Sequence, residues 1–338
     1  TLIMGIKELG SFLLRECPEA IYNVKLSDRK GTKCAVDVSL FLYKFKYSNG
    51  ENFLEKFIEL INRFKINGIT PIFVFDGCPP KEKVDTINER KDKKNEYKEM
   101  VKALKEKQEN LLDDSNEEKE NIDKEIEKIT KKIIYVTKDN INQLKYLLDL
   151  LNIKYIHRQC EADLVNSKLC SQGYVDMVIS EDMDHLTSGA KYLMRDFNVN
   201  NNNVKCYDLE KIKTTLGLSN EKWIELCILF GCDYLKRIKG LGTVSSYKYI
   251  KHNQDKNIEE ILEMIKKSKN LEIPENYIEE FKNAKKIFEN DTTEVSQEDI
   301  NVGSVFDNQK DNVMIYLKKY TKLSDRKIKN RVNNIFSE

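Results

Sequence analysis

The 338-residue sequence lacks several features that would assign it to a class at once. Its eight cysteines include no Cys-x-x-Cys pair, and its three histidines show no zinc-binding spacing. No apolar run approaches the roughly 20 residues that cross a bilayer. The formal net charge is only +1, so the chain as a whole has no basic excess that would announce a nucleic-acid binder. These absences argue against a zinc module and a membrane-spanning or secreted protein, and they predict an intracellular protein with reduced thiols.

What the chain does have is a series of apolar, β-branched runs separated by helical patterns. The runs cover residues 34–43, 70–77, 153–157 and 175–182, and we expect them to be strands buried on both faces. The segment between the first two runs has apolar residues at helical spacing and ends at Gly68, a typical helix C-cap. Alternating strands and helices predict an α/β fold with a mostly parallel sheet flanked by helices.

Residues 81–135 interrupt this alternation with a segment rich in Lys and Glu. Its second half has apolar side chains four, three and four residues apart, at Ile122, Ile126, Ile129 and Ile133, which predicts an amphipathic helix. Residues 113–118 are predicted to turn one helix into the next. Taken alone, this segment is better explained as a solvated, salt-bridged helical pair without a function of its own. Beyond residue 221 the pattern is again helical, apart from a polar, extended stretch over 292–309.

Acidic residues follow the ends of the predicted strands. The set comprises Asp37, Asp76, Asp182 and Asp184 at strand ends, Glu161 and Asp163 where a helix begins, and Asp233 where a helix ends. Because parallel strands end at the same edge of a sheet, we expect these carboxylates to converge. Each acid alone is explained by helix capping, but two carboxylates about 4 Å apart repel by roughly 4 kcal/mol. The set therefore predicts either bound cations or several protonated acids.

The ligand type indicates which cation. A site built from carboxylate oxygens, without paired His or Cys, favours Mg²⁺ or Mn²⁺ over zinc or copper. Two such ions about 3.5–4 Å apart are the usual device for phosphodiester hydrolysis. Kinases and single-metal phosphatases also use Asp and Mg²⁺, but the chain has no Gly-rich phosphate loop of the Walker type. Metal-assisted phosphodiester cleavage is the chemistry that the pattern favours.

Two basic elements accompany the acids. Lys83 and Arg90 are seven residues apart and so share a helix face, which we expect to point back toward Asp76 and a scissile phosphate. A tight turn at Gly240 and Gly242 precedes a further helix, where backbone amides could approach a phosphate. Solvated surface residues and an ordinary helix connection are the plainer alternatives for the two elements.

Seven motifs now fall into a recognisable order: MGIKELGSFL, AVDVSLFLY, PIFVFDGCPP, CEAD, SEDMDHLT, YLMR and CILFGCDYL with IKGLG. In this order the chain resembles the flap endonuclease family of XPG-like, structure-specific 5′ nucleases along nearly its whole length. The resemblance implies a PIN-like 5′ nuclease fold with a catalytic domain over 1–290. Its parts would be an N-terminal part (4–80), a helical arch (81–135), an internal part (136–220) and a helix-two-turn-helix region (221–290). Residues 291–338 would form a loop and a helix that pack on the core.

The resemblance also implies roles for individual residues. Two Mg²⁺ ions, replaceable by Mn²⁺, would be held by Asp37, Asp76, Glu161, Asp163, Asp182, Asp184 and Asp233, while Glu181 matches no ligand position. Lys83 and Arg90 would be the catalytic basic pair. DNA contacts would come from Gly5, Tyr43, Lys131, Lys132, Gly240, Gly242, Thr243 and Lys248, with K⁺ at the turn of the helix-two-turn-helix region.

The function implied is a 5′ flap endonuclease with 5′→3′ exonuclease activity on branched or flapped duplex DNA. We expect a monomer that acts in the nucleus or another intracellular site of DNA replication or repair. An exonuclease, a gap or Holliday-junction nuclease, an RNA-cleaving relative and a non-catalytic DNA-binding scaffold remain alternatives. The chain departs from the family in having Asp163 where Glu is commoner, and in lacking the sliding-clamp motif near its tail, so clamp binding is not expected.

Overall fold

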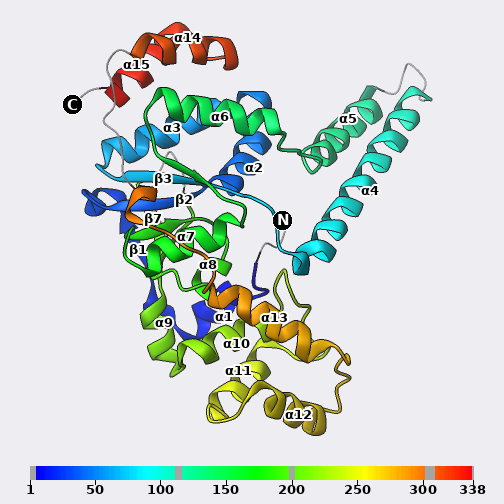
Figure 1. Ribbon diagram of the computed structural model, residues 1–338. Coiled ribbons are helices and arrows are strands. Elements are labelled where there is room, and N and C mark those ends of the chain that lie inside the picture. The colour runs from blue at the N-terminus through cyan, green and yellow to red at the C-terminus, as the bar shows by residue number, and fades with distance from the viewer. Residues whose placement is uncertain (1–4, 111–115, 198–201, 301–308, 337–338) are drawn as a thin grey trace.

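The computed structural model of the protein describes residues 5–110, 116–197, 202–300 and 309–336, and it is built on a seven-stranded sheet (Figure 1). The strands are β1 (Ile21–Lys25), β2 (Lys33–Asp37), β3 (Thr70–Phe75), β4 (Tyr155–His157), β5 (Met177–Ile179), β6 (Tyr192–Arg195) and β7 (Asn203–Asp208). They lie in the order β1-β7-β6-β5-β2-β3-β4. The five strands from β6 to β4 pair in parallel, whereas β7 is antiparallel to β6 and β1. The predicted mostly parallel sheet is confirmed.

Helices cover both faces of the sheet. They are α1 (Leu9–Glu16), α2 (Val38–Asn49), α3 (Phe53–Ile66), α4 (Val84–Glu109), α5 (Asn116–Thr130), α6 (Lys138–Leu150), α7 (Ala162–Ser171), α8 (Asp184–Thr187), α9 (Leu209–Leu216), α10 (Asn220–Phe230), α11 (Thr243–His252), α12 (Ile258–Lys269), α13 (Tyr277–Glu289), α14 (Lys310–Tyr320) and α15 (Asp325–Phe336). One hydrophobic core joins the sheet to α2, α3, α6, α14 and α15. The other joins the opposite face to α1 and α7 through α13. No helix among the described residues is long and apolar enough to span a bilayer.

The central strands are apolar throughout because they face both cores. Along β2, Ala35 belongs to the core with α7 and α10, whereas Cys34 and Val36 belong to the core with α2 and α3. All three side chains are fully buried. Successive side chains of a strand point to opposite faces, so a strand covered on both sides needs a continuous apolar run.

The prediction that residues 34–43 form one strand is wrong in its second half. The strand β2 ends at Asp37, whose carboxylate accepts a hydrogen bond from the backbone N–H of Leu40 and caps α2. The apolar residues that follow are buried at helical spacing, at Val38, Phe41, Leu42 and Phe45. The apolar run therefore turns from strand to helix at the acid itself, because the side chain of Asp37 satisfies an otherwise unpaired amide of the first helical turn.

The predicted helical hairpin is present as α4 and α5, which project from the body of the protein (Figure 1). We call α4 and α5 the arch. None of the 26 residues of α4 is buried. In α5, Ile122 and Ile129 are buried and Ile126 is half-buried, in agreement with the predicted amphipathic pattern, but the helix ends at Thr130, before Ile133. The predicted turn at 113–118 lies partly outside the described residues, and α5 already begins at Asn116.

The helical region after residue 220 begins with a helix that is buried along most of its length. Every residue from Lys222 to Phe230 in α10 is buried. The chain leaves this helix through Gly231 and reaches Asp233 directly afterwards. At the other end of the chain, α14 and α15 bury Val313, Leu317 and Val332 in the core that also contains α3, so two helices rather than one pack there.

Candidate metal and nuclease site

The seven predicted acids lie at the ends of neighbouring elements. Asp37 ends β2, Asp76 follows β3, Glu161 caps α7, Asp163 lies in its first turn, Asp182 and Asp184 follow β5, and Asp233 follows α10. Strands β3, β2 and β5 are adjacent and parallel, so their carboxyl ends share one edge of the sheet. We call this set the carboxylate edge.

Backbone and hydroxyl donors hold several of these acids in place. Ser180 Oγ donates to Asp37 Oδ2 over 2.8 Å, the backbone N–H of Ile6 donates to Asp184 Oδ1 over 2.9 Å, and that of Ala162 donates to Asp76 Oδ1 over 2.9 Å. Each carboxylate is thereby oriented while part of its acceptor capacity remains available. Such oriented oxygens suit a hard cation.

Burial makes ionisation of these acids costly in free energy. It raises the pKa of Asp37 to about 7, with repulsion from Asp76 as the next contribution. Burial also raises the pKa of Asp163 and of Asp184 well above the usual range, and repulsion from Asp182 adds to both. Desolvation disfavours the charged form of each acid, and the neighbouring carboxylates repel one another. A cation among them would remove both costs, so the donor set fits a divalent metal.

Two cations at the base of the arch lie against this edge: Lys83, in the 3₁₀ turn Lys81–Lys83 just before α4, and Arg90 within α4. Lys83 Nζ lies 2.5 Å from Glu161 Oε1 and 3.5 Å from Asp233 Oδ2, and Arg90 donates to both oxygens of Asp233 over 3.0 and 2.8 Å. Burial opposes the charge of Lys83, but the carboxylates of Glu161, Asp163 and Asp233 outweigh it and raise the Lys83 pKa. The prediction that both residues lie in one helix is wrong for Lys83, which precedes α4 in a 3₁₀ turn, but both side chains reach the same edge. The partners are Glu161 and Asp233 instead of the expected Asp76.

Glu161 has a second partner that the sequence analysis did not identify. The buried hydroxyl of Tyr234 donates to Glu161 Oε2 over 2.7 Å, and Lys83 Nζ lies 5.8 Å from the centre of the same ring. Tyr234 directly follows Asp233, so its adjacency to a predicted ligand was the available signal. It fixes the orientation of Glu161.

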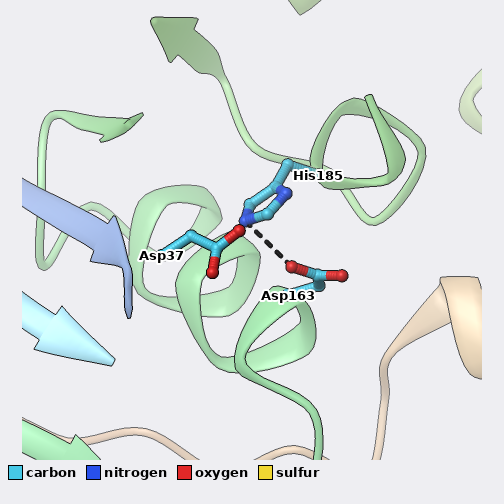
Figure 2. Close-up of side chains that lie close together, drawn as sticks. All are labelled: Asp37, Asp163 and His185. Carbon is cyan, nitrogen blue, oxygen red and sulfur yellow. Dashed lines mark ion pairs between the residues drawn. The ribbon is translucent and has the colours of Figure 1, made fainter. Parts of the chain in front are cut away.

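His185 is the other residue that the sequence analysis missed. Its imidazole is fully buried and lies beside Asp37 and Asp163, with its Nε2 3.4 Å from Asp163 Oδ1 (Figure 2). The ligand atoms of these three residues all lie within 4.8 Å of one another. Burial lowers the pKa of His185 to about 3, so the ring is neutral. The histidines had been set aside for lack of zinc spacing, yet the position of His185 next to Asp184 was a usable signal.

Gly5 and Glu181 both lie next to the acids in the structure, but only Gly5 packs against them. Gly5 has a φ of 73°, and a Cβ atom there would lie 2.1 Å from Asp182 Oδ1 and 2.6 Å from Asp184 Oδ1. The backbone at Gly5 therefore packs directly against two of the acids. Glu181 turns to other partners: its Oε2 accepts from the backbone N–H of Asp196 over 3.1 Å, and its Oε1 lies 3.6 Å from Lys44 Nζ.

The remaining predicted DNA contacts lie at the surface in two places. Near the arch, Tyr43 is 45% exposed with Lys94 Nζ 5.4 Å from its ring centre. Lys131 pairs with Glu127, and Lys132 Nζ lies 5.0 Å from the ring centre of Tyr97.

The second place is the turn before α11. Gly240 has a φ of 84°, which favours glycine, and the exposed Gly242 has open space where a Cβ would be. Thr243 begins α11 as predicted and is buried, while Lys248 is exposed on the same helix. The turn thus presents backbone and a lysine to solvent, and the assignment of DNA contacts here stays a prediction.

Comparisons with known proteins agree with this geometry. Residues 4–97 match the XPG N-terminal domain and residues 152–233 match the XPG I-region. Flap endonuclease 1 of Yarrowia lipolytica is 36% identical over 294 residues, which cover 81% of this chain and 74% of that protein.

Solved structures show the same fold. The catalytic core of Rad2 in complex with a DNA substrate aligns with a TM-score of 0.69 at 21% identity, covering 98% of this chain and 100% of that one. Flap endonuclease-1 from Methanococcus jannaschii aligns with a TM-score of 0.65 at 23% identity, covering 94% and 95%. Both alignments span nearly the whole chain.

Proposed function

Because this chain belongs to the flap endonuclease 1 family of XPG nucleases, we propose that it hydrolyses phosphodiester bonds at flaps and junctions of duplex DNA. The observation that carries the proposal is the carboxylate edge, where buried acids from separate elements face two cations from the arch. A nuclear site of action follows from this role and is part of the proposal.

The seven acids would hold two Mg²⁺ ions, for which Mn²⁺ could substitute. When bound, the pair of ions would activate water and neutralise charge at the leaving oxygen. Asp37, Asp76 and Asp184 are oriented by the donors described above, so they would hold the ions without rearrangement of the strands. Oriented ligands of this kind are a requirement for precise metal chemistry.

Lys83 and Arg90 would stabilise the scissile phosphate. Each already lies against the carboxylate edge with its charge balanced by Glu161 or Asp233. Ions bound by those acids would leave the two side chains free to turn to the phosphate, where charge develops during cleavage. Tyr43 would stack on the base beside the cleaved bond. The turn at 240–242 would bind duplex backbone, with K⁺ as a further ligand.

The test is cleavage of an end-labelled 5′-flap duplex in Mg²⁺ by the protein and two adjacent variants. Asp182→Asn removes a predicted ligand, while Glu181→Gln changes the neighbouring acid that contacts Asp196 instead. We expect Asp182→Asn to lose at least about 10³-fold in rate and Glu181→Gln to keep the rate of the unmodified protein. No cleavage by the unmodified protein, or equal cleavage by both variants, would overturn the proposal.

The same assay separates the alternatives within the family. Product lengths on nicked, gapped, flapped and four-way DNA distinguish a flap endonuclease from an exonuclease and from a junction nuclease. A flap made of RNA tests the RNA-cleaving alternative. A protein that binds all of these DNA substrates and cuts none would be the non-catalytic scaffold.

A further inference from the structure

Two exposed tyrosines at the base of the arch share one lysine. Tyr43 lies in α2 and Tyr135 in the segment between α5 and α6, and each is 45% exposed. Lys94 Nζ lies over both rings, 5.4 Å from the centre of Tyr43 and 4.6 Å from that of Tyr135, and it donates to the backbone oxygen of Ile134 over 2.8 Å. Segments far apart in the sequence thus bring two aromatic rings to one place beside α4.

The lysines at this place lack the acidic partners that other arch lysines have. Lys94 and Lys98 lie on the face of α4 that also carries Arg90, and Lys98 Nζ is 5.1 Å from the ring centre of Tyr135. Among the described residues, neither ammonium group forms an ion pair with a carboxylate. Three other arch lysines do pair with glutamates, namely Lys107, Lys124 and Lys131. Because α4 leads away from the body of the protein, this unpaired positive charge extends outward from the carboxylate edge (Figure 1).

Rings and unpaired cations together fit a single-stranded nucleic acid. Proteins that bind single strands combine aromatic side chains, on which nucleobases stack, with positive charges that follow the phosphates. Stacking of a nucleobase on an aromatic ring is stronger than an exposed cation–π contact, so a nucleobase can displace the Lys94 ammonium group from the ring of Tyr135. The displaced ammonium group and that of Lys98 then lie beside the strand, whose phosphates supply the negative charge that α4 does not.

We propose that Tyr135 is a stacking residue for an unpaired nucleobase of the 5′ single strand, in addition to the stacking predicted for Tyr43. The proposal rests on the proposed function, because it assumes that flapped DNA is bound with its junction at the carboxylate edge. A nucleobase inside a duplex is already stacked on both faces, so Tyr135 contacts only the single-stranded part of the substrate.

Affinity for a 5′-flap duplex and for the same duplex without a flap tests the proposal. Every protein compared also carries Asp182→Asn, so that the strand stays intact. Tyr135→Ala should weaken binding of the flapped DNA on the order of tenfold, whereas Tyr135→Phe, which keeps the ring, should weaken it by less than about twofold. Neither change should alter binding of the duplex without a flap. Tyr146→Ala is the matched control, because Tyr146 is 53% exposed in α6 and its ring centre lies 4.9 Å from that of Tyr316 in α14.

Flaps that lack one nucleobase locate the contact. At one position of the flap, removal of the nucleobase should weaken binding by the protein with Tyr135 on the order of tenfold and leave binding by Tyr135→Ala unchanged, because the two changes remove the same contact. Three results would overturn this inference and leave the proposed function standing. They are equal weakening of flapped and unflapped DNA by Tyr135→Ala, equal weakening by Tyr135→Ala and Tyr135→Phe, and the absence of such a position. Failure of the protein with Tyr135 to bind flapped DNA at all would overturn both.

Discussion

The arch and the carboxylate edge both carry many charged side chains, but those of the arch are exposed to solvent and those of the edge are buried. The arch is a pair of helices in which α4 buries no residue, and its charges are solvated along most of its length. The carboxylate edge buries Asp37, Asp182 and Asp184 at the ends of strands whose own side chains are packed on both faces. Charge therefore costs little in the arch and much at the edge.

The two regions meet at the base of the arch. Arg90 pairs with the Asp233 carboxylate, Lys83 pairs with Glu161, and Thr86 Oγ1 donates to the backbone oxygen of Asp233 over 2.8 Å. Because α4 has no hydrophobic anchor, these polar contacts place its first turns against the site. The arch therefore depends on the carboxylate edge for its position, whereas the carboxylate edge depends on the core.

The largest effect should come from cutting the link between the two regions. Lys83→Ala and Arg90→Ala are each expected to lower the cleavage rate by about 10²–10³-fold, because each removes a positive charge that would face the scissile phosphate. Single-turnover cleavage of a 5′-flap duplex measures the loss. Arg90→Lys, which keeps the charge, should lose less than Arg90→Ala. A loss below threefold in both alanine variants would contradict the proposed role.

A methyl group at Gly5 should disturb the edge without touching the arch. Gly5→Ala places a Cβ against Asp182 and Asp184, and a displacement of about 1 Å in a site can cost about 10²-fold in rate. Gly31 is the matched control, because its φ of 83° is similar and its Cβ would meet nothing within 4 Å. Both variants carry the same backbone strain, but only Gly5→Ala should lose cleavage. Equal cleavage rates would show that the acids tolerate the shift.

Raising the pH should destabilise the metal-free edge. Asp37 has a folded pKa of about 7 against 3.8 for the free group, so the folded state binds its proton more tightly. The stabilisation is complete below pH 4 and is lost as the pH rises through about 7. For Asp37 alone, the free energy of unfolding should fall by ~3 kcal/mol between about pH 5 and pH 8.

Thermal melts in a chelator across this pH range measure that fall, and Asp37→Asn should make it smaller, with the rest due to Asp163 and Asp184. Saturating Mg²⁺ should restore stability most at high pH, because ions bind the ionised acids and the folded state together. A metal-free protein whose stability rises over this range would contradict the burial argument.

The smallest effect is expected in the outer part of the arch. Lys124 is exposed and lies 3.8 Å from the equally exposed Glu120. Lys124→Ala should change the free energy of unfolding by less than about 0.5 kcal/mol and the cleavage rate by less than about twofold. A large loss of cleavage in Lys124→Ala would mean that the outer arch contacts the substrate. The conclusion that only the base of the arch acts in cleavage would then be wrong.

The sequence predicted the parts of the structure that follow from strand order. Placing Asp37, Asp76 and Asp182 after apolar runs was enough to bring them to one edge, because parallel strands allow no other arrangement. The helical pattern of α5 was equally readable from Ile122 and Ile129. Local periodicity and sheet geometry both act over short stretches, so a single sequence carries them.

Other features depend on packing that no short stretch encodes. The antiparallel strands β1 and β7 escaped prediction because polar residues interrupt their apolar positions, as the sequences IYNVK and NVKCYD show. The contacts of His185 and Tyr234 depend on side-chain directions set by other elements. The same holds for Lys83, which pairs with Glu161 because of how α4 leaves the body of the protein.

The buried helix α10 has a further consequence. Asp233 directly follows α10, whose residues 222–230 are buried, and α11, which begins just after the turn at 240–242, packs against α10, so the core sets the distance between Asp233 and the turn. If the turn binds duplex DNA as proposed, α10 fixes the distance between the bound duplex and the phosphodiester that is cleaved. Loosening it, for example with Trp223→Ala, should scatter the position of cleavage along the strand, a change that appears in product lengths before it appears in rate.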